Sequence, residues 1–299
     1  MFGLSTKDVV LLKETASLTE EYAKKACSLK DVGGMEEWAK KNTNGNGNGN
    51  DISCEWYHST WQYLRLLNMV AVPNWYEFYN SAISDVLKKY KRPRVFISAC
   101  ADYGMLAKLH ESIKETGIMP EIVIYDICQS SLMSCNWYAE KTGLNIICKT
   151  GNIISDDIPE KPFDLIVTDE FLTVLKDEDK PIVTRKWYDL LAEGGTVITT
   201  IMIGEKTTTE KRSYYYNRAR KTYFDNKQMM FPFINNNDQE ALLLQKFKYF
   251  ADVHTRHMIN DESIINELFK LFSKINYTIT ITPGECVNPT PSCQIVATK

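Results

Sequence analysis

Short runs of apolar, mostly β-branched residues recur along the middle of the chain, and stretches with helical spacing separate them. Runs that are apolar throughout suit strands covered on both faces, as in a parallel sheet. Five strands are predicted in this region: RVFISA (94–99), EIVIYD (121–126), LNIICKT (144–150), PFDLIVTD (162–169) and TVITTIMI (196–203). The alternation of strands and helices predicts an α/β fold with a doubly wound, mostly parallel, Rossmann-like sheet.

The end of the chain adds two further strands. After a predicted helix over 262–275, the segments NYTITIT (276–282) and QIVATK (294–299) read as strands joined by PGECVNPTPS. This joint is too short for a crossover helix, so the two strands are expected to be antiparallel neighbours. The complete prediction is a seven-stranded sheet with an antiparallel last strand.

Between the strands, apolar positions at helical spacing predict helices over 105–116, 130–142 and 179–192. The pair Gly194-Gly195 is expected to turn the chain before the fifth strand. Another helix is predicted over about 74–90, ahead of the first strand.

Residues 1–73 are predicted to form an N-terminal helical appendage or lid, and residues 74–299 the sheet domain. The appendage is expected to contain short helices over 5–41, a mobile Asn/Gly loop over 42–50 and a helix over 53–71 that Pro73 ends. The sheet domain carries a helical cap insert at 205–260, with two helices at about 208–228 and 238–257.

The charge, hydropathy and cysteine content of the chain argue against several classes of function. A formal net charge of −3 argues against a broad nucleic-acid-binding surface, and no apolar run of about 18 residues is present to span a membrane. The first residues do not resemble a secretion signal. The eight cysteines form no Cys-x-x-Cys pair and have no zinc-ligand spacing to histidine, so we expect buried, reduced thiols in a cytoplasmic protein and no metal. The oligomeric state stays open.

Small or acidic residues follow the first two predicted strands, where a doubly wound sheet binds its ligands. The first strand leads into Ala99-Cys100-Ala101-Asp102-Tyr103-Gly104, which has Gly-x-Gly-x-x-Gly spacing with alanines at the first two glycine positions. Asp126 ends the second strand, where a carboxylate can accept both hydroxyls of a ribose. An ordinary strand-to-helix turn and a helix N-cap are the structural alternatives.

The next two strands also end in polar residues. Gly151-Asn152-Ile153 follows the third strand, and its amide could bond an adenine whose face Ile153 would cover. Asp169 and Glu170 follow the fourth strand, where the reacting end of a ligand should lie. A loop asparagine and helix capping are the plainer interpretations. The placement of one polar group after each consecutive strand predicts a shared binding site.

The stretch 94–203 resembles the class I S-adenosylmethionine-dependent methyltransferases. The motifs that carry the resemblance are VFISACADYGM, EIVIYDI, KTGNIISD, FDLIVTDEFL and WYDLLAEGGTVI, together with the antiparallel ending. It covers roughly residues 74–203 and 262–299, and leaves out the N-terminal helices and the 205–260 insert.

The resemblance implies S-adenosyl-L-methionine as the cofactor and assigns residues to its methionine end. Ala99, Ala101 and Gly104 would form the loop beneath the methionine part, and Asp102 would reach its amino group. Asp169 would also lie near this end.

For the adenosine end, the resemblance implies that Asp126 holds the ribose, with Ile127 beside the adenine. Asn152 would contact the adenine amino group, and Ile153 would pack on the ring. The chain departs from the family pattern in two places. Ile97-Ser98 stands inside the first strand, where an acidic residue is usual, and Ala-x-Ala replaces Gly-x-Gly, although alanine disfavours positive φ.

Methyl transfer from a sulfonium is an in-line displacement, in which the enzyme positions the nucleophile and excludes water. A proton acceptor contributes about 10²–10⁴-fold. Glu170 is the favoured catalytic residue, and Tyr57 and His58 are further candidates. By contrast, His254 and His257 read as surface residues on a helix.

The segment WYHSTWQYLR (56–65) is unusually aromatic. It is either a helix that packs on the sheet or a lid across the cofactor, in which Tyr57, His58 and Trp61 face the sulfonium and Arg65 lies near a carboxylate.

The sequence therefore predicts an S-adenosylmethionine-dependent methyltransferase that acts on a small-molecule acceptor through N, O or S, with no nucleic-acid or membrane partner. Three alternatives stay open. A NAD(P)-dependent dehydrogenase is suggested by Asp126 and by the Tyr223-x-x-x-Lys227 spacing. A non-catalytic cofactor-binding module is suggested by the Ala-x-Ala loop, and transfer of an aminocarboxypropyl group is the third.

Overall fold

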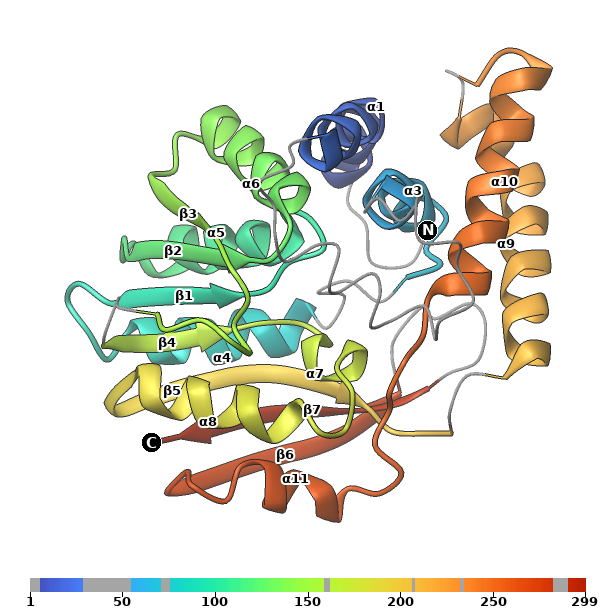
Figure 1. Ribbon diagram of the computed structural model, residues 1–299. Helices are drawn as coiled ribbons and strands as arrows, with labels where there is room; N and C mark the ends of the chain where they lie inside the picture. The colour runs from blue at the N-terminus through green and yellow to red at the C-terminus, as the bar shows by residue number, and fades with distance from the viewer. Residues whose placement is uncertain are drawn as a thin grey trace.

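A seven-stranded sheet with the order β3-β2-β1-β4-β5-β7-β6 runs through the molecule (Figure 1). This computed structural model describes residues 6–28, 55–70, 76–158, 162–205, 208–231, 234–281 and 290–299. The strands are β1 (Arg94–Ser98), β2 (Glu121–Asp126), β3 (Ile146–Thr150), β4 (Phe163–Val167), β5 (Leu191–Met202), β6 (Lys274–Ile281) and β7 (Pro291–Thr298).

The strand pairing confirms the predicted fold class. β1 pairs in parallel with both β2 and β4, and β4 pairs in parallel with β5. β7 lies antiparallel between β5 and β6. Because successive strands extend in one direction from β1 to β3 and in the other from β4 to β5, the order reverses between β1 and β4, which is where a doubly wound sheet binds ligands.

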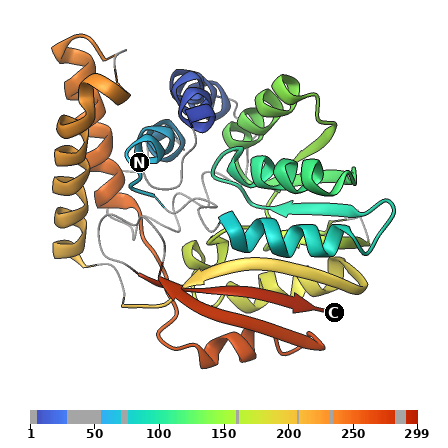
Figure 2. The same cartoon turned by 180° about the vertical axis from the view of Figure 1, so that it is seen from behind.

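Helices cover both faces of this sheet (Figures 1 and 2). One face carries α4 (Tyr76–Leu87), α5 (Gly104–Thr116) and α6 (Gln129–Thr142), and the other carries α7 (Phe171–Val174), α8 (Lys180–Leu190) and α11 (Ser263–Leu268). Successive side chains of a strand point to opposite faces. Accordingly, Val95 and Ile97 of β1 join the core with α5, whereas Phe96 joins the core with α8.

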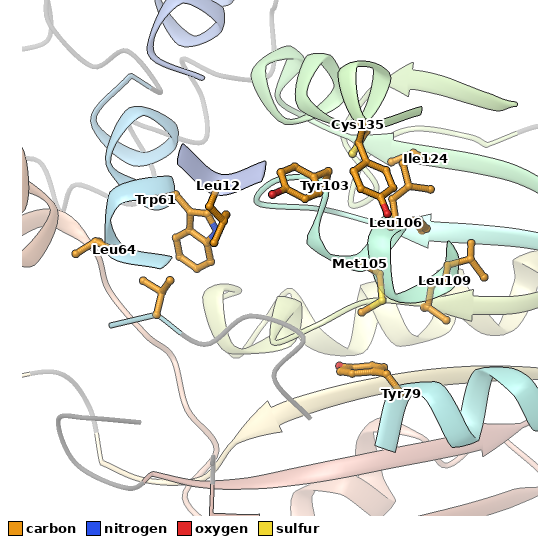
Figure 3. Packing of buried hydrophobic residues seen from close by; sticks show 14 of the residues in the cluster. Leu12, Trp61, Leu64, Tyr79, Tyr103, Met105, Leu106, Leu109, Ile124 and Cys135 are labelled. Atoms are coloured by element: carbon orange, nitrogen blue, oxygen red, sulfur yellow. The ribbon is translucent and has the colours of Figure 1, made fainter. Parts of the chain in front are cut away.

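Of the helices that the structure describes, four more lie beyond the carboxyl ends of the parallel strands: α1 (Thr6–Ser28), α3 (Glu55–Leu66), α9 (Thr209–Met230) and α10 (Asn237–Val253) (Figure 1). They share one apolar cluster with the α5 face of the sheet, and Figure 3 shows Leu12 of α1 and Trp61 of α3 at its outer side. Polar contacts also link the helices, since Lys246 of α10 forms an ion pair of 2.9 Å with Glu20 of α1. We call these four helices the covering layer.

Several predicted elements differ in extent from those observed. α1 is one continuous helix rather than several short ones. The Gly194-Gly195 pair lies inside β5, where Gly194 has a φ of 74° and the register against β4 shifts, so the glycines form a bulge rather than a turn between elements. The predicted helix over 262–275 ends already at Leu268.

Other predictions stay untested. The expected loop at 42–50 and the Pro73 stop lie outside the described residues, and the division at residue 73 remains a prediction. None of the described helices combines the length and hydropathy needed to cross a membrane.

Ser98, in the strand where the sequence resemblance implied an acidic residue, has a packing role. The Trp187 indole N–H of α8 donates to Ser98 Oγ at 2.8 Å, and both side chains are fully buried. Ser98 therefore accepts a hydrogen bond from the indole N–H of Trp187, which would otherwise be buried without a partner.

We expect Trp187→Phe and Ser98→Ala each to destabilise the chain, because each leaves the other polar atom buried without its partner. A double-mutant cycle by urea unfolding should give a coupling energy of about 1 kcal/mol between the two side chains. Purely additive effects would contradict a stabilising hydrogen bond at this position.

Candidate active site

Asp126 connects the loops that follow β1 and β2. Its Oδ2 accepts the backbone N–H of Cys100 at 2.8 Å, and its Oδ1 accepts that of Cys128 at 2.6 Å. Burial, which leaves the residue 7% exposed, raises the pKa of Asp126 to about 6, although the two backbone donors act in the opposite direction. Each carboxylate oxygen keeps a lone pair for another donor.

The loop after β1 adopts a glycine-like conformation without glycine. Ala99 has a φ of 63°, and its N–H donates to the Tyr125 carbonyl at 2.9 Å. Left-handed backbone is strained for alanine and requires surroundings that hold it in place. Asp102 then forms a local turn just before α5, since its Oδ1 accepts the Gly104 N–H at 2.7 Å. Ala99 thus adopts a backbone conformation that glycine would adopt without strain.

The polar face of α3 lies on this loop. His58 Nδ1 is 3.0 Å from the Ala101 carbonyl oxygen, Gln62 Nε2 donates to Asp102 Oδ2 at 2.7 Å, and Arg65 forms an ion pair with the same oxygen. These three residues of α3 are 5%, 0% and 7% exposed, respectively. The helix that carries the candidate catalytic residues therefore contacts the predicted cofactor loop. A helix packed on the sheet and a lid across a cofactor both make such contacts, so the lid stays a prediction.

His58 is the histidine of this polar face of α3, and its surroundings shift its pKa strongly. Burial alone would lower its pKa, but Cys128, which hydrogen-bonds to it, and Asp126 raise the pKa of His58 to about 9. At neutral pH the ring is therefore an imidazolium, which can donate a hydrogen bond but cannot accept a proton.

An aromatic group from two elements covers this polar face. The ring of Tyr57 stacks on Trp61 at 5.2 Å and on Phe250 of α10 at 5.7 Å. Burial, together with Asp102 and Asp126, raises the pKa of Tyr57, so its phenol is neutral. The Trp61 indole N–H is buried and has no hydrogen-bond partner among the described residues.

His254 is not the surface residue of a helix that the sequence suggested. α10 ends at Val253, and the half-buried His254 ring stacks on Phe250 at 4.8 Å. Burial, helped by Arg256 and Arg212, lowers the pKa of His254 to about 3, so this ring is neutral. His257 is also half-buried and outside the helix.

Two adjacent carboxylates follow β4. Asp169 Oδ1 accepts hydrogen bonds from Tyr79 at 2.8 Å and Thr200 at 2.9 Å. Glu170 accepts from the hydroxyls of Thr173 and Ser292, each at 2.5 Å. Burial raises the pKa of both carboxyls, and Asp169 raises that of Glu170 further.

Glu170 stands in the left-handed region with a φ of 52°, as Ala99 does after β1. Strained backbone thus occurs after both strands that flank the switch point. The buried Thr168 hydroxyl beside them has no hydrogen-bond partner among the described residues. Orphaned polar atoms of this kind, here and at Trp61, are available to a ligand.

The residues after β3 lie differently from the others. Asn152 Oδ1 accepts the Ile154 N–H at 3.0 Å in a local turn, and the Asn152 N–H donates to Asp156. Ile153 is 6% exposed and belongs to the core on the α8 face of the sheet. Their predicted contacts with an adenine stay predictions. Ile127, after β2, is half-buried.

The structure thus brings together most of the predicted residues in two groups. Asp102, Asp126, Tyr57, His58 and Trp61 meet around the ends of β1 and β2, and a second group, Asp169 and Glu170, follows β4. Among the described residues, no three His, Cys, Asp or Glu side chains are arranged to hold a metal ion.

The sequence did not identify several residues that contact the candidate site. Gln62 was detectable, because His58, Gln62 and Arg65 are four and three residues apart and therefore share one face of a helix. Tyr79 and Ser292 gave no signal, since each reaches the site only through tertiary pairing.

The residue pair that suggested a dehydrogenase has another role. Tyr223 and Lys227 both bond Glu240 of α10, the tyrosine at 3.0 Å, and so link α9 to α10. They lie on α9, in the covering layer, rather than at a strand end.

No protein-family model matches the chain, and no match is found among curated proteins. Among solved structures, the chain is similar to a putative O-methyltransferase from Nostoc punctiforme, with 15% identity, a TM-score of 0.48 and coverage of 95% of this chain and 72% of that chain.

Another similar structure is the CMeT domain of the citrinin polyketide synthase, with 13% identity, a TM-score of 0.45 and coverage of 69% of this chain and 46% of that chain. A third is TehB from Haemophilus influenzae, with 14% identity, a TM-score of 0.44 and coverage of 73% of this chain and 62% of that chain. This chain therefore spans less than two thirds of either protein. At such identities the similarity concerns the fold alone.

We expect Ala99→Gly to raise the free energy of unfolding by about 1 kcal/mol, because glycine adopts a left-handed φ without the steric cost to alanine. Urea unfolding followed by circular dichroism measures this change. Ala107→Gly, inside α5, is the matched control and should lower stability by about 1 kcal/mol. A destabilised Ala99→Gly variant would show that the alanine is not strained.

Glu170 should make stability depend on pH in a defined direction. Burial and Asp169 raise its pKa from 4.5 to about 7, so between these values the folded chain binds more protons than the unfolded chain, and stability falls as pH rises. The stability of Glu170→Gln relative to the wild type should therefore increase from pH 4.5 to 7 and level off above.

Denaturant unfolding at a series of pH values measures this difference, and Glu193→Gln, on the exposed start of β5, controls for the loss of a surface carboxylate. A difference between Glu170→Gln and the wild type that does not change with pH would refute the assignment.

Proposed function

We propose that this chain, which has the fold of the class I S-adenosylmethionine-dependent methyltransferases, transfers a methyl group from S-adenosyl-L-methionine to a small-molecule acceptor by in-line displacement at N, O or S. One observation carries the proposal. Buried carboxylates follow β1, β2 and β4 at the switch point of the sheet, and two of the connecting loops there have strained backbone. We also propose that the protein acts in the cytoplasm without a nucleic-acid or membrane partner.

The residues present fit such a cofactor. Asp126, which keeps acceptor capacity on both oxygens, would hold the ribose, with Ile127 beside the adenine and Asn152 toward its amino group. The orphaned Trp61 N–H supplies a free donor. The backbone from Ala99 to Gly104 would approach the methionine part, for which small side chains leave room. When bound, the cofactor supplies an electrophilic methyl group on a positively charged sulfur.

Glu170 is the proposed general base. A carboxyl whose pKa lies near neutrality can accept a proton from an amine, hydroxyl or thiol acceptor and still be ionised at the start of the reaction. His58 is protonated at neutral pH, so we assign it to holding α3 on the loop after β1 rather than to accepting a proton. The neutral Tyr57 offers a hydrogen-bond donor and an aromatic face toward a sulfonium.

A non-catalytic cofactor-binding module is the alternative that one observation favours. Asp102 already has three protein donors, and α3 lies directly on the loop after β1. Binding of S-adenosylmethionine without methylated product across amine, hydroxyl and thiol acceptors would favour this alternative, and a labelled methyl group in any product would exclude it. The mass of the product separates methyl transfer from aminocarboxypropyl transfer.

We expect Asp126→Ala to weaken binding of S-adenosylhomocysteine by about 1–3 kcal/mol, the scale for a buried polar partner left unmatched. Isothermal titration calorimetry measures the dissociation constant. Asp164→Ala is the control, because Asp164 also accepts a backbone N–H, from Arg94 at 2.8 Å, but at the amino end of the sheet.

If Asp126→Ala binds S-adenosylhomocysteine as tightly as the wild type does, Asp126 does not hold the ribose. No binding of S-adenosylmethionine or S-adenosylhomocysteine by the wild type at millimolar concentration would reject the proposed function as a whole.

A further inference from the structure

Each carboxylate oxygen of Glu170 accepts a hydrogen bond from a hydroxyl group. Thr173 of α7 donates to Oε2 and Ser292 of β7 donates to Oε1, both at 2.5 Å. Short O–H···O distances of about 2.5–2.7 Å are characteristic of hydroxyl donors on an ionised carboxylate. Thr173 and Ser292 are 1% and 0% exposed, so water does not compete for either hydroxyl. Two elements, α7 and β7, therefore set the orientation of this carboxyl group.

Thr173 directs its hydroxyl hydrogen to Glu170. Its Oγ1 accepts the backbone N–H of Met202 in β5 at 3.0 Å, and a hydroxyl has a single hydrogen to donate. Among the described residues, Glu170 Oε2 is the acceptor of that hydrogen. Thr200 is oriented in the same way, since it accepts the Glu170 N–H at 3.0 Å and donates to Asp169. Backbone amides thus orient two hydroxyls as donors to neighbouring carboxylates.

The donors around Glu170 match a carboxylate rather than an amide. A carboxylate offers acceptor lone pairs on both oxygens, whereas the amide of a glutamine offers them on one oxygen and carries N–H donors on the other atom. Because Thr173 and Ser292 donate to different oxygens, a neutral amide would accept from only one of them. Burial favours the neutral form of a carboxyl group, so the two hydroxyls act against the effect of burial.

Charged and titratable groups from several segments also face Glu170. Burial and Asp169 raise its pKa, whereas the two hydroxyls and then Arg256, in the segment after α10, lower it. Tyr79 of α4 and Cys293 of β7 are neutral near pH 7, because burial raises the pKa of both side chains. The two hydroxyls are therefore the strongest influences that favour the ionised form of Glu170.

We propose that Ser292 and Thr173 are positioning residues, which hold Glu170 as an oriented carboxylate that takes the proton of the acceptor. The inference rests on the proposed function, because it takes Glu170 as the general base. Glu170 takes up the proton that the acceptor loses on methylation, on a lone pair that neither hydroxyl occupies. The electron pair of the broken bond between the methyl group and sulfur stays on the sulfur. Neither hydroxyl is consumed, so both act through Glu170.

The first test needs no cofactor. For Ser292→Ala, we expect the pKa of Glu170 in the folded chain to rise by about one pH unit, because a hydroxyl binds an ionised carboxyl more strongly than a neutral one. The free energy of unfolding of Ser292→Ala is compared with that of Ser292→Ala/Glu170→Gln over a series of pH values. Stability that depends on a raised pKa is lost until the pH exceeds the folded value. The difference should therefore level off about one pH unit higher than the same difference in the wild-type background, which levels off near pH 7.

The second hydroxyl supplies matched variants. Thr173→Val should shift the levelling pH in the same direction, whereas Thr173→Ser, which keeps the hydroxyl, should not. Thr184→Val is the control for loss of a buried hydroxyl, because Thr184 of α8 is 2% exposed and donates to the Pro181 carbonyl instead of a carboxylate. If the difference for Ser292→Ala levels off at the wild-type pH, the hydroxyl does not act on the ionisation of Glu170 and the proposal is overturned.

The second test follows transfer of a labelled methyl group from S-adenosylmethionine to ethanolamine, phenol or 2-mercaptoethanol, which serve as amine, hydroxyl and thiol probes. The acid limb of the kcat/KM profile should move up by about one pH unit in Ser292→Ala. Activity should therefore fall about 5-fold at pH 7 and return to the wild-type level at alkaline pH. A merely structural role of Ser292 would instead lower activity equally at all pH values.

The outcomes separate the positioning role from the proposed function. An acid limb that stays in place while the stability difference shifts would overturn the role of the hydroxyls in proton transfer and leave methyl transfer as proposed. A wild type that binds no S-adenosylmethionine, or methylates none of the three probes, would overturn the proposed function, and the role of the hydroxyls with it.

Discussion

The carboxyl edge of a parallel sheet leaves backbone amides without a strand partner, and in this protein one carboxylate binds two of them. Asp126 accepts the N–H of Cys100 after β1 and the N–H of Cys128 after β2, so it fixes the distance between two neighbouring loops. The same residue influences the charge of His58 on α3. The arrangement of both loops, and of the helix that lies on them, therefore depends on a single buried anion at the end of β2.

The sheet could be predicted from the sequence because its strands are covered on both faces. Each strand is consequently a continuous apolar run, and β2 was predicted with its observed bounds. The errors arose where tertiary context overrides local pattern. Gly194 reads as a turn, but its positive φ forms a bulge within β5, and the helix after Glu262 gives way to β6, whose residues are held by pairing with β7.

The site could be predicted only in part, and for a related reason. Residues after parallel strands must meet at one edge, so Asp102, Asp126 and Asp169 could be located by counting along the chain. Their partners could not, because Tyr79 and Ser292 come from elements whose pairing the local sequence does not specify. Ile153 packs into the core on the α8 face, and its predicted contact with an adenine stays a prediction.

The covering layer comes from two separate parts of the chain. α1 and α3 precede the sheet, whereas α9 and α10 are inserted between β5 and β6, and the two pairs meet over the strand ends (Figure 1). None of the strands in the described part of the chain is interrupted by this layer. The segment from α9 to α10 therefore leaves and rejoins the sheet at one place in the chain, between β5 and β6, whereas the residues that follow β1, β2 and β4 come from other segments.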